Sequence, residues 1–443
     1  MALLSIREHG RIHLGEFDPA RPSVSSAQAD TLSTLGITYG VDVFNFVNRT
    51  TLAAQQFVGA VQLGLHTVEV LPKVDGDSKS VRRNLVLMLA VALDLNISEG
   101  EAARLARQEY GILEILIRLF SDKLFAQVHR GLVRRYECKE ENLSVLRGKL
   151  GIAEQVRLNA ANPERLFCRF DEFLEDNPLN QVFKAAIRLL LGVAQSLTNQ
   201  RQLAELLLVF EGVSDCPRAS LPWHRVVHDR LSDRYRPCFR LAELFLKDRP
   251  PDVSGGRAHG FSLFFDMNML FEEYIGRIAR RVLQPSGFRV TLQSPRKYLA
   301  LSNELGTQVF AMLPDVVGTG SLGVEWILDT KWKQLSAEKS KDGVAQDDMY
   351  QMYAYAQRYS CPNVVLLYPH HQDLGETAGV RSTYLLAPWL GEAGHRDERR
   401  QVRVATIDLV LMAARNRGDS PRSVGSGFQS AGSSPDPVGR FGF

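Results

Sequence analysis

The sequence predicts a multidomain α+β protein. Its 443 residues correspond to about two to four domains of ordinary size. The first part contains short runs of β-branched and aromatic residues, and apolar residues at helical spacing begin near Ser80. A third part follows a segment rich in proline and glycine, and it alternates helix and strand patterns. These patterns predict a β-containing domain, a helical region and a small α/β domain, in that order.

The N-terminal β-rich domain is expected to span residues 1–78. Residues 36–44 form a short β-branched and aromatic run punctuated by glycine, which is typical of strands joined by turns. Residues 57–62 and 65–70 are two further runs, and they flank Gly64. This arrangement predicts a β-hairpin around that glycine.

A helical middle region is expected over residues 79–246. Four apolar residues of one segment fall on a single helical face: Ile112, Ile115, Leu116 and Leu119. Residues 247–260 then concentrate proline, glycine, aspartate and serine between two apolar segments. This composition predicts a linker between the middle region and the last domain.

The last domain is expected to span residues 261–415. A long helix over 261–283 is followed by three strand patterns, a helix near 345–359, and further strands. Residues 416–443 are rich in glycine, serine and proline without periodicity, which predicts a disordered tail.

Charge, cysteine content and hydropathy exclude several protein classes. The 53 basic and 50 acidic residues give a net charge of +3, which excludes a histone-like polycation but permits a local basic channel. The five cysteines are scattered, as expected for reduced thiols in an intracellular protein. No apolar run approaches the roughly 20 residues of a membrane span, and no secretory signal is visible. We therefore expect a cytoplasmic protein without a membrane partner.

The strongest chemical pattern pairs Asp315 with Asp329 and Lys331. Asp315 lies near the end of one apolar strand pattern, residues 308–317, and the other two residues end the next. Residues two apart on a strand face the same side, and a hairpin would bring Asp315 beside them. Two facing carboxylates repel unless a cation lies between them, and oxygen ligands without a Cys or His cluster favour Mg²⁺ or Mn²⁺. A lysine beside the metal suits phosphodiester hydrolysis.

Two other segments can complete this site. Glu272 or Glu273, on the preceding helix, could supply another carboxylate to the metal. Gln351 and Tyr355 are four residues apart and share one face of the following helix. The alternative interpretation is that the two aspartates are turn residues and the lysine is merely exposed. The placement of these residues at the ends of consecutive strands favours the catalytic interpretation.

The elements Pro314-Asp315, Asp329-x-Lys331 and Gln351-x-x-x-Tyr355 resemble the PD-(D/E)xK nuclease superfamily. Upstream segments, including "HRGLVRRYECKEENLSVLRGKLGIAEQVRLN" and "DMNMLFEEYI", resemble McrC, the nuclease subunit family of the modified-cytosine restriction systems. The resemblance covers most of residues 36–385.

The resemblance implies a restriction-endonuclease-like C-terminal fold and Mg²⁺-dependent DNA cleavage in phage defence. It implies catalytic roles for Asp315, Asp329 and Lys331, with Gln351 in the same site. Glu272 matches the family's position better than Glu273, and the metal would be held by Asp315, Asp329 and Glu272.

The resemblance also implies a separate partner, an AAA+ GTPase ring of the McrB type. The chain contains no G-x-x-x-x-G-K-[ST] phosphate-binding loop, so a partner must supply any nucleotide hydrolysis. The helical middle region is the expected docking site. Two alternatives remain open: a nuclease for RNA or unmodified DNA, and an adaptor whose main task is to activate the ring.

Overall fold

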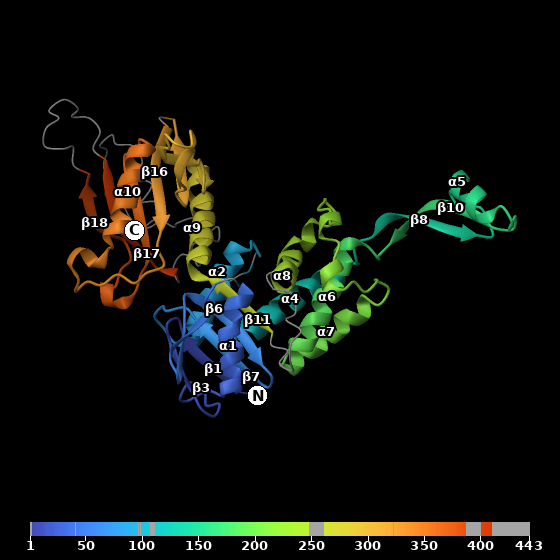
Figure 1. Cartoon of the computed structure of the whole chain (residues 1–443), viewed down its shortest axis with the longest axis horizontal. Coiled ribbons are helices and arrows are strands. Elements are labelled where there is room, and N and C mark those ends of the chain that lie inside the picture. Colours follow the sequence, from blue (N-terminus) through green and yellow to red (C-terminus); the bar gives the residue numbers. More distant parts are fainter. Residues whose placement is uncertain are drawn as a thin grey trace.

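The computed structural model describes residues 2–39, 41–95, 97, 99–106, 111–247, 261–321, 323–386 and 400–409. It has three parts: two sheets near the N-terminus, a group of helices with a projecting arm, and a C-terminal sheet flanked by helices (Figure 1). The predicted α+β multidomain fold is confirmed. Most of the expected linker and the whole expected tail lie outside the described residues. None of the described helices is both long and apolar enough to cross a membrane.

Two four-stranded sheets form the N-terminal part. The first has the order β1 (Ala2–Arg7), β7 (His66–Leu71), β6 (Phe57–Leu63), β11 (Ser262–Asp266). The second has the order β3 (Ser23–Val24), β2 (Arg11–Leu14), β5 (Thr51–Ala54), β4 (Phe44–Asn48). The antiparallel pair β6–β7 is the predicted hairpin, and Gly64 in its turn has a φ of 65°. The prediction of this hairpin is confirmed.

The prediction of strand structure over residues 36–44 is wrong for the first half of this segment. Helix α1 (Ser26–Tyr39) extends into this segment, and β4 begins only at Phe44. Ser25 and Gln28 cap the helix start reciprocally, side chain to backbone N–H. Ala29 and Leu32, three residues apart, are fully buried in the N-terminal core. Packing of this helical face therefore overrides the local preference for strand.

The middle region is largely helical, as predicted. Its helices are α2 (Ser78–Ala92), α3 (Glu99–Ala106), α4 (Ile112–Val128), α6 (Pro178–Val193), α7 (Leu197–Val209) and α8 (Arg236–Leu246). Short 3₁₀ turns lie before α8: Arg218–Ser220, Trp223–Arg225 and Asp233–Tyr235. The four α4 residues predicted to share a face are all buried in one core with α6 and α8.

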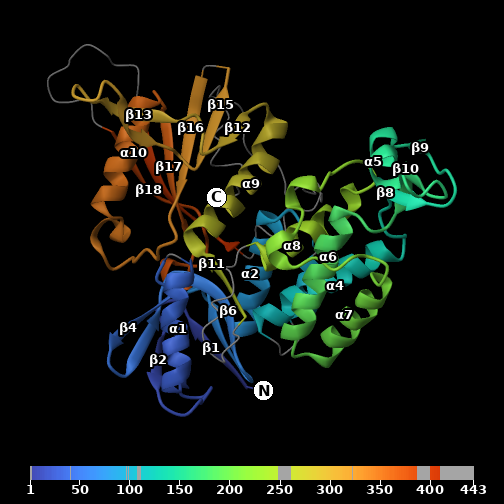
Figure 2. The ribbon, with the colours of Figure 1, turned by 45° about the vertical axis from the view of Figure 1, so that its right-hand side comes forward.

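An all-helical middle region is nevertheless wrong, because a small sheet projects from it. The sheet has the order β8 (Arg135–Leu143), β10 (Leu166–Leu174), β9 (Lys149–Leu150), and α5 (Ile152–Asn159) packs on β10. Figures 1 and 2 show this unit extending away from the helices, so we call it the arm. None of the residues of β8 is buried, so no buried apolar face marks the strand.

The expected long helix over 261–283 begins later than predicted. Residues Ser262–Asp266 form β11, which pairs antiparallel with β6 of the N-terminal sheet, and α9 (Met267–Leu283) follows directly. Close approach of the two strands requires Gly59, since a Cβ there would lie 1.9 Å from the carbonyl oxygen of Leu263. The N-terminal sheet is therefore completed by a strand that follows the middle region in sequence.

The C-terminal part is a six-stranded mixed sheet. Its order is β12 (Arg289–Leu292), β15 (Val316–Gly320), β16 (Gly323–Thr330), β17 (Asn363–Pro369), β19 (Gln401–Ile407), β18 (Val380–Leu385). The hairpin β13 (Lys297–Leu301) and β14 (Gln308–Met312) and the 3₁₀ turns Gln284–Ser286, Ser340–Gly343 and Gln372–Leu374 lie outside it. On β16, Trp326 and Leu328 belong to the core shared with α9, whereas Ile327 belongs to the core shared with α10 (Gln346–Arg358). The two helices therefore cover opposite faces of the sheet.

Candidate active site

The two predicted aspartates lie side by side on antiparallel strands. Asp315 precedes β15 directly, because Pro314 separates β14 from β15 in what the sequence suggested was one strand. The next residue, Val316, pairs with Leu328, which places Asp315 opposite Asp329. Asp315 Oδ2 accepts hydrogen bonds from the backbone N–H and the hydroxyl of Thr330, both at 2.7 Å. These bonds fix the orientation of the Asp315 carboxylate.

Lys331 lies on the α10 side of the sheet together with Asp329. Its ammonium group forms an ion pair with Asp329 Oδ2 and donates to Gln351 Oε1 at 3.1 Å. The amide nitrogen of Gln351 donates to the Tyr355 hydroxyl at 2.8 Å, and that hydroxyl donates to the carbonyl oxygen of Leu313. Since Leu313 is two residues from Asp315, the network returns to the segment between β14 and β15 that carries the first aspartate.

Burial makes this set of charges energetically costly. Asp329 is 1% exposed, and burial together with the nearby Asp315 raises its pKa to about 7. Burial also raises the pKa of Asp315, although its hydrogen bonds from Thr330 oppose the shift. Burial acts to lower the pKa of Lys331, but the surrounding carboxylates outweigh it and the net pKa is raised. The carboxylates of the site therefore carry more negative charge than the single positive charge of Lys331 neutralises.

Glu272 faces the same site from α9. Its pKa is raised by burial and then by the charge of Asp315. Gln293 donates from its side chain to Glu272 Oε1 at 2.6 Å and from its backbone N–H to the carbonyl oxygen of Asp315 at 3.0 Å. Glu273 instead pairs with Arg277, one turn further along the helix. The geometry therefore favours Glu272 over Glu273 as the site carboxylate.

Three neighbours of this site were not predicted from the sequence. Gln293 joins Glu272 to Asp315, and Thr330 holds Asp315 in place. Asp348, at the start of α10, accepts from Lys333 at 3.0 Å and lies close enough to Asp329 to raise its pKa. Only Thr330 could have been found from the sequence, since it lies between two predicted residues on the same strand.

The donor chemistry of the site fits a hard divalent cation. Each aspartate uses Oδ2 for a hydrogen bond, and the described residues donate none to Oδ1 of either. The described residues contain no ready group of three His, Cys, Asp or Glu side chains for a metal, so Glu272 is not within direct reach in this arrangement. Mg²⁺ is commonly held by one or two carboxylates, water and substrate phosphates, which suits the Asp315–Asp329 pair.

Comparisons with solved structures agree with this fold. One is a refined half-complex from the tetradecameric assembly of Thermococcus gammatolerans McrB AAA+ hexamers with bound McrC. It matches 94% of this chain and 98% of the compared chain, with a TM-score of 0.64 and 23% identity. The cryo-EM structure of the Thermococcus gammatolerans McrBC complex matches 63% of this chain and 88% of the compared chain, with a TM-score of 0.50 and 24% identity.

The comparison with curated proteins gives no match. A family profile described as McrBC 5-methylcytosine restriction system component matches residues 52–369, which is more than two thirds of the chain. This range contains every site residue described above. The resemblance inferred from the sequence is thereby confirmed at the level of the family: the chain belongs to the McrBC 5-methylcytosine restriction system components.

Proposed function

We propose that this chain is the nuclease subunit of a modification-dependent restriction system. It would cut DNA by metal-dependent phosphodiester hydrolysis, together with an AAA+ GTPase ring of the McrB type. The observation that carries the proposal is the pairing of the buried Asp329 with the partly buried Asp315, with the ammonium group of Lys331 beside Asp329. An adaptor without catalysis has no need for two costly carboxylates next to one lysine.

Each residue of the site has a distinct proposed role. Asp315 and Asp329 would hold Mg²⁺ or Mn²⁺, with Glu272 reaching the ion through water. The bound ion would neutralise charge on the scissile phosphate. The Lys331 ammonium group would donate to a phosphate oxygen as negative charge develops on it. Gln351 would orient that ammonium group, because its amide is itself fixed by the Tyr355 hydroxyl.

The partner assignment rests on the family and on the matched structures, one of which is an assembly of McrB AAA+ hexamers with bound McrC. We propose residues 1–246 as the docking platform. Apolar side chains are unusually exposed on the arm, which is typical of an interaction surface. They include Tyr136, Val145, Leu146, Ile152 and Val156, each more than half exposed.

The test is cleavage by the chain mixed with its cognate ring partner, GTP and Mg²⁺. We expect cuts in duplex DNA containing 5-methylcytosine and none with Asp329→Asn, which should still stimulate GTP hydrolysis. Parallel reactions with unmodified DNA and RNA separate the alternative substrates. Full stimulation of the ring without cleavage of any nucleic acid would leave the adaptor as the correct function.

A further inference from the structure

Glu8 is a buried carboxylate that joins the N-terminal sheet to the candidate active site. It follows β1 and is only 3% exposed. Its carboxylate accepts from the backbone N–H of Lys73 at 2.8 Å and from the indole N–H of Trp332 at 3.0 and 3.1 Å. Lys73 lies just beyond β7, so one bond stays within the N-terminal part and the other crosses to the C-terminal part.

Trp332 is the residue that follows Lys331. These neighbours lie just beyond β16 and point to opposite sides: Lys331 donates to Gln351 on α10, whereas Trp332 packs against the core on the α9 side. The Trp332 ring lies 5.3 Å from that of Phe271, with the planes at 60°. Phe271 in turn precedes Glu272 on α9. Trp332 therefore belongs to the segment that carries Lys331 and contacts the helix that carries Glu272.

The backbone around Lys331 is held at several points. Thr330 donates to Asp315, and the Lys331 backbone N–H donates to the carbonyl oxygen of Leu367 on β17. Beyond Trp332, the side chain of Gln334 donates to the carbonyl oxygen of Lys73 at 3.2 Å. Trp332 and Gln334 thus attach this segment to the N-terminal part, while Lys333 between them pairs with Asp348 of α10.

The surroundings of Glu8 make its contact with Trp332 hard to replace. Burial raises the pKa of Glu8, and the bonds from Lys73 and Trp332 oppose that shift. The nearby Asp266, which caps the start of α9, raises the pKa further. A buried carboxylate that loses one of its two donors is destabilised, so the indole N–H is kept in place.

We propose that Glu8 is a positioning residue for DNA cleavage: by holding the Trp332 indole it fixes the backbone that places Lys331. The inference rests on the nuclease function proposed above. Under this proposal, the geometry of the active site depends on the position of the N-terminal sheet relative to the C-terminal part. The N-terminal sheet also contains β11, which leads directly into the helix that carries Glu272.

The test uses the full chain with its ring partner, GTP, Mg²⁺ and 5-methylcytosine DNA under single-turnover conditions. Trp332→Phe keeps a ring against Phe271 and removes the N–H. It should slow cleavage about tenfold, the equivalent of one hydrogen bond to a charged group, without weakening DNA binding. In a Lys331→Ala background the same change should cause no further loss. Glu8→Gln keeps an acceptor and should stay within about threefold of the unmodified chain, whereas Glu8→Leu should match Trp332→Phe.

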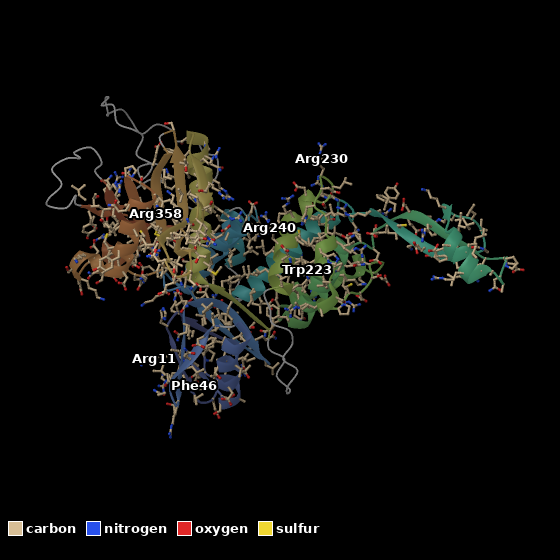
Figure 3. All side chains as sticks on the ribbon, turned by 45° about the horizontal axis from the view of Figure 1, so that its top comes forward. Arg11, Phe46, Trp223, Arg230, Arg240 and Arg358 are labelled. Atoms are coloured by element: carbon tan, nitrogen blue, oxygen red, sulfur yellow. The ribbon has the colours of Figure 1, made fainter. Side chains whose placement is uncertain are left out.

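Figure 3 places Trp223 on the helices of the middle region, within the proposed docking platform, so the matched control is instead Trp326→Phe. Trp326 is buried in the C-terminal sheet, and its indole N–H donates to none of the described residues. Trp326→Phe should leave the cleavage rate unchanged, and Trp332→Phe should leave GTPase stimulation unchanged. The inference is overturned if Trp332→Phe cleaves at the full rate, if its effect persists in the Lys331→Ala background, or if GTPase stimulation falls in parallel. Absence of Mg²⁺-dependent cleavage by the unmodified chain would instead refute the proposed function, and the inference with it.

Discussion

Replacing Asp329 by asparagine should stabilise the metal-free chain at about pH 8 and change it little at about pH 4.5. Burial and the Asp315 charge raise the pKa of Asp329 from 3.8 to about 7. Between these two values the folded chain binds more protons than the unfolded chain, so stability falls as pH rises through this window. Asparagine resembles the protonated acid in shape and is never charged, so it avoids this loss.

The size of the effect follows from the pKa shift. About three pH units at 1.36 kcal/mol each set a ceiling of roughly 4 kcal/mol. The repulsion belongs jointly to Asp315 and Asp329, and water and side chains reorganise around an ionised group, so we expect about half of this ceiling, roughly 2 kcal/mol. For a folding unit of the size of the C-terminal part, this corresponds to a rise in Tm of about 4–8 °C.

The assay is thermal unfolding with EDTA at both pH values, followed by circular dichroism. Asp373→Asn is the control, because that side chain is 96% exposed and should give no shift. Added Mg²⁺ should raise the Tm of the unmodified chain at about pH 8 and have a much smaller effect on Asp329→Asn, since the ion would lose one ligand. The reasoning is refuted if Asp329→Asn lowers the Tm at about pH 8, or raises it equally at both pH values.

The remaining predictions concern the lysine, the docking platform and the strand junction. Lys331→Ala should reduce the single-turnover cleavage rate by about 10²–10³-fold with DNA affinity retained, and Lys331→Arg should rescue poorly because its shape differs; loss of affinity alone would contradict this. A truncated chain that ends at residue 266 keeps β11 and should stimulate the GTPase activity of the ring. A chain that ends at residue 246 lacks β11 and should either stimulate this activity less or unfold at a lower temperature. Equal GTPase stimulation and equal thermal stability of the two truncated chains would refute this prediction. In urea titrations, Gly59→Ala should lower the free energy of unfolding by about 3 kcal/mol, because the new Cβ would meet the backbone of Leu263. Gly64 has open space around it, so Gly64→Ala should lower the free energy of unfolding by only about 1 kcal/mol. Equal losses for the two variants would rule out the steric cause.

The central part of the site could be predicted because its spacing is local. Asp329 lies near the end of β16 and Lys331 directly follows that strand, two residues later, and a short hairpin brings Asp315 to them. Gln351 and Tyr355 are four apart on one helix, and the structure joins them by a hydrogen bond. In each case a single period, that of a strand or a helix, is enough to place the side chains on a common face.

The other contacts of the site join residues that are far apart in the sequence, and such contacts leave no signal in the local sequence pattern. Gln293 reaches Glu272 through the pairing of β12 with β15, and nothing in its own segment indicates this contact. Glu8 and Trp332 are 324 positions apart. Strands β8 and β10 of the arm escaped prediction for another reason: β8 buries no residue and β10 buries only Cys168 and Phe170, so the apolar signal of a strand is weak.

The proposed division of the chain into a docking platform and a nuclease requires a physical connection through which the docking part could control the other. Two links join them at the site itself. The N-terminal sheet contains β11, which continues without a break into α9 and so sets the position of Glu272. It also holds Trp332 through Glu8, next to Lys331. A movement of the N-terminal sheet would therefore displace Glu272 and Lys331 relative to the paired aspartates, which are held by the C-terminal sheet. Catalysis is sensitive to displacements of about 1 Å. A docked ring that shifts the N-terminal sheet by this distance could therefore switch cleavage on.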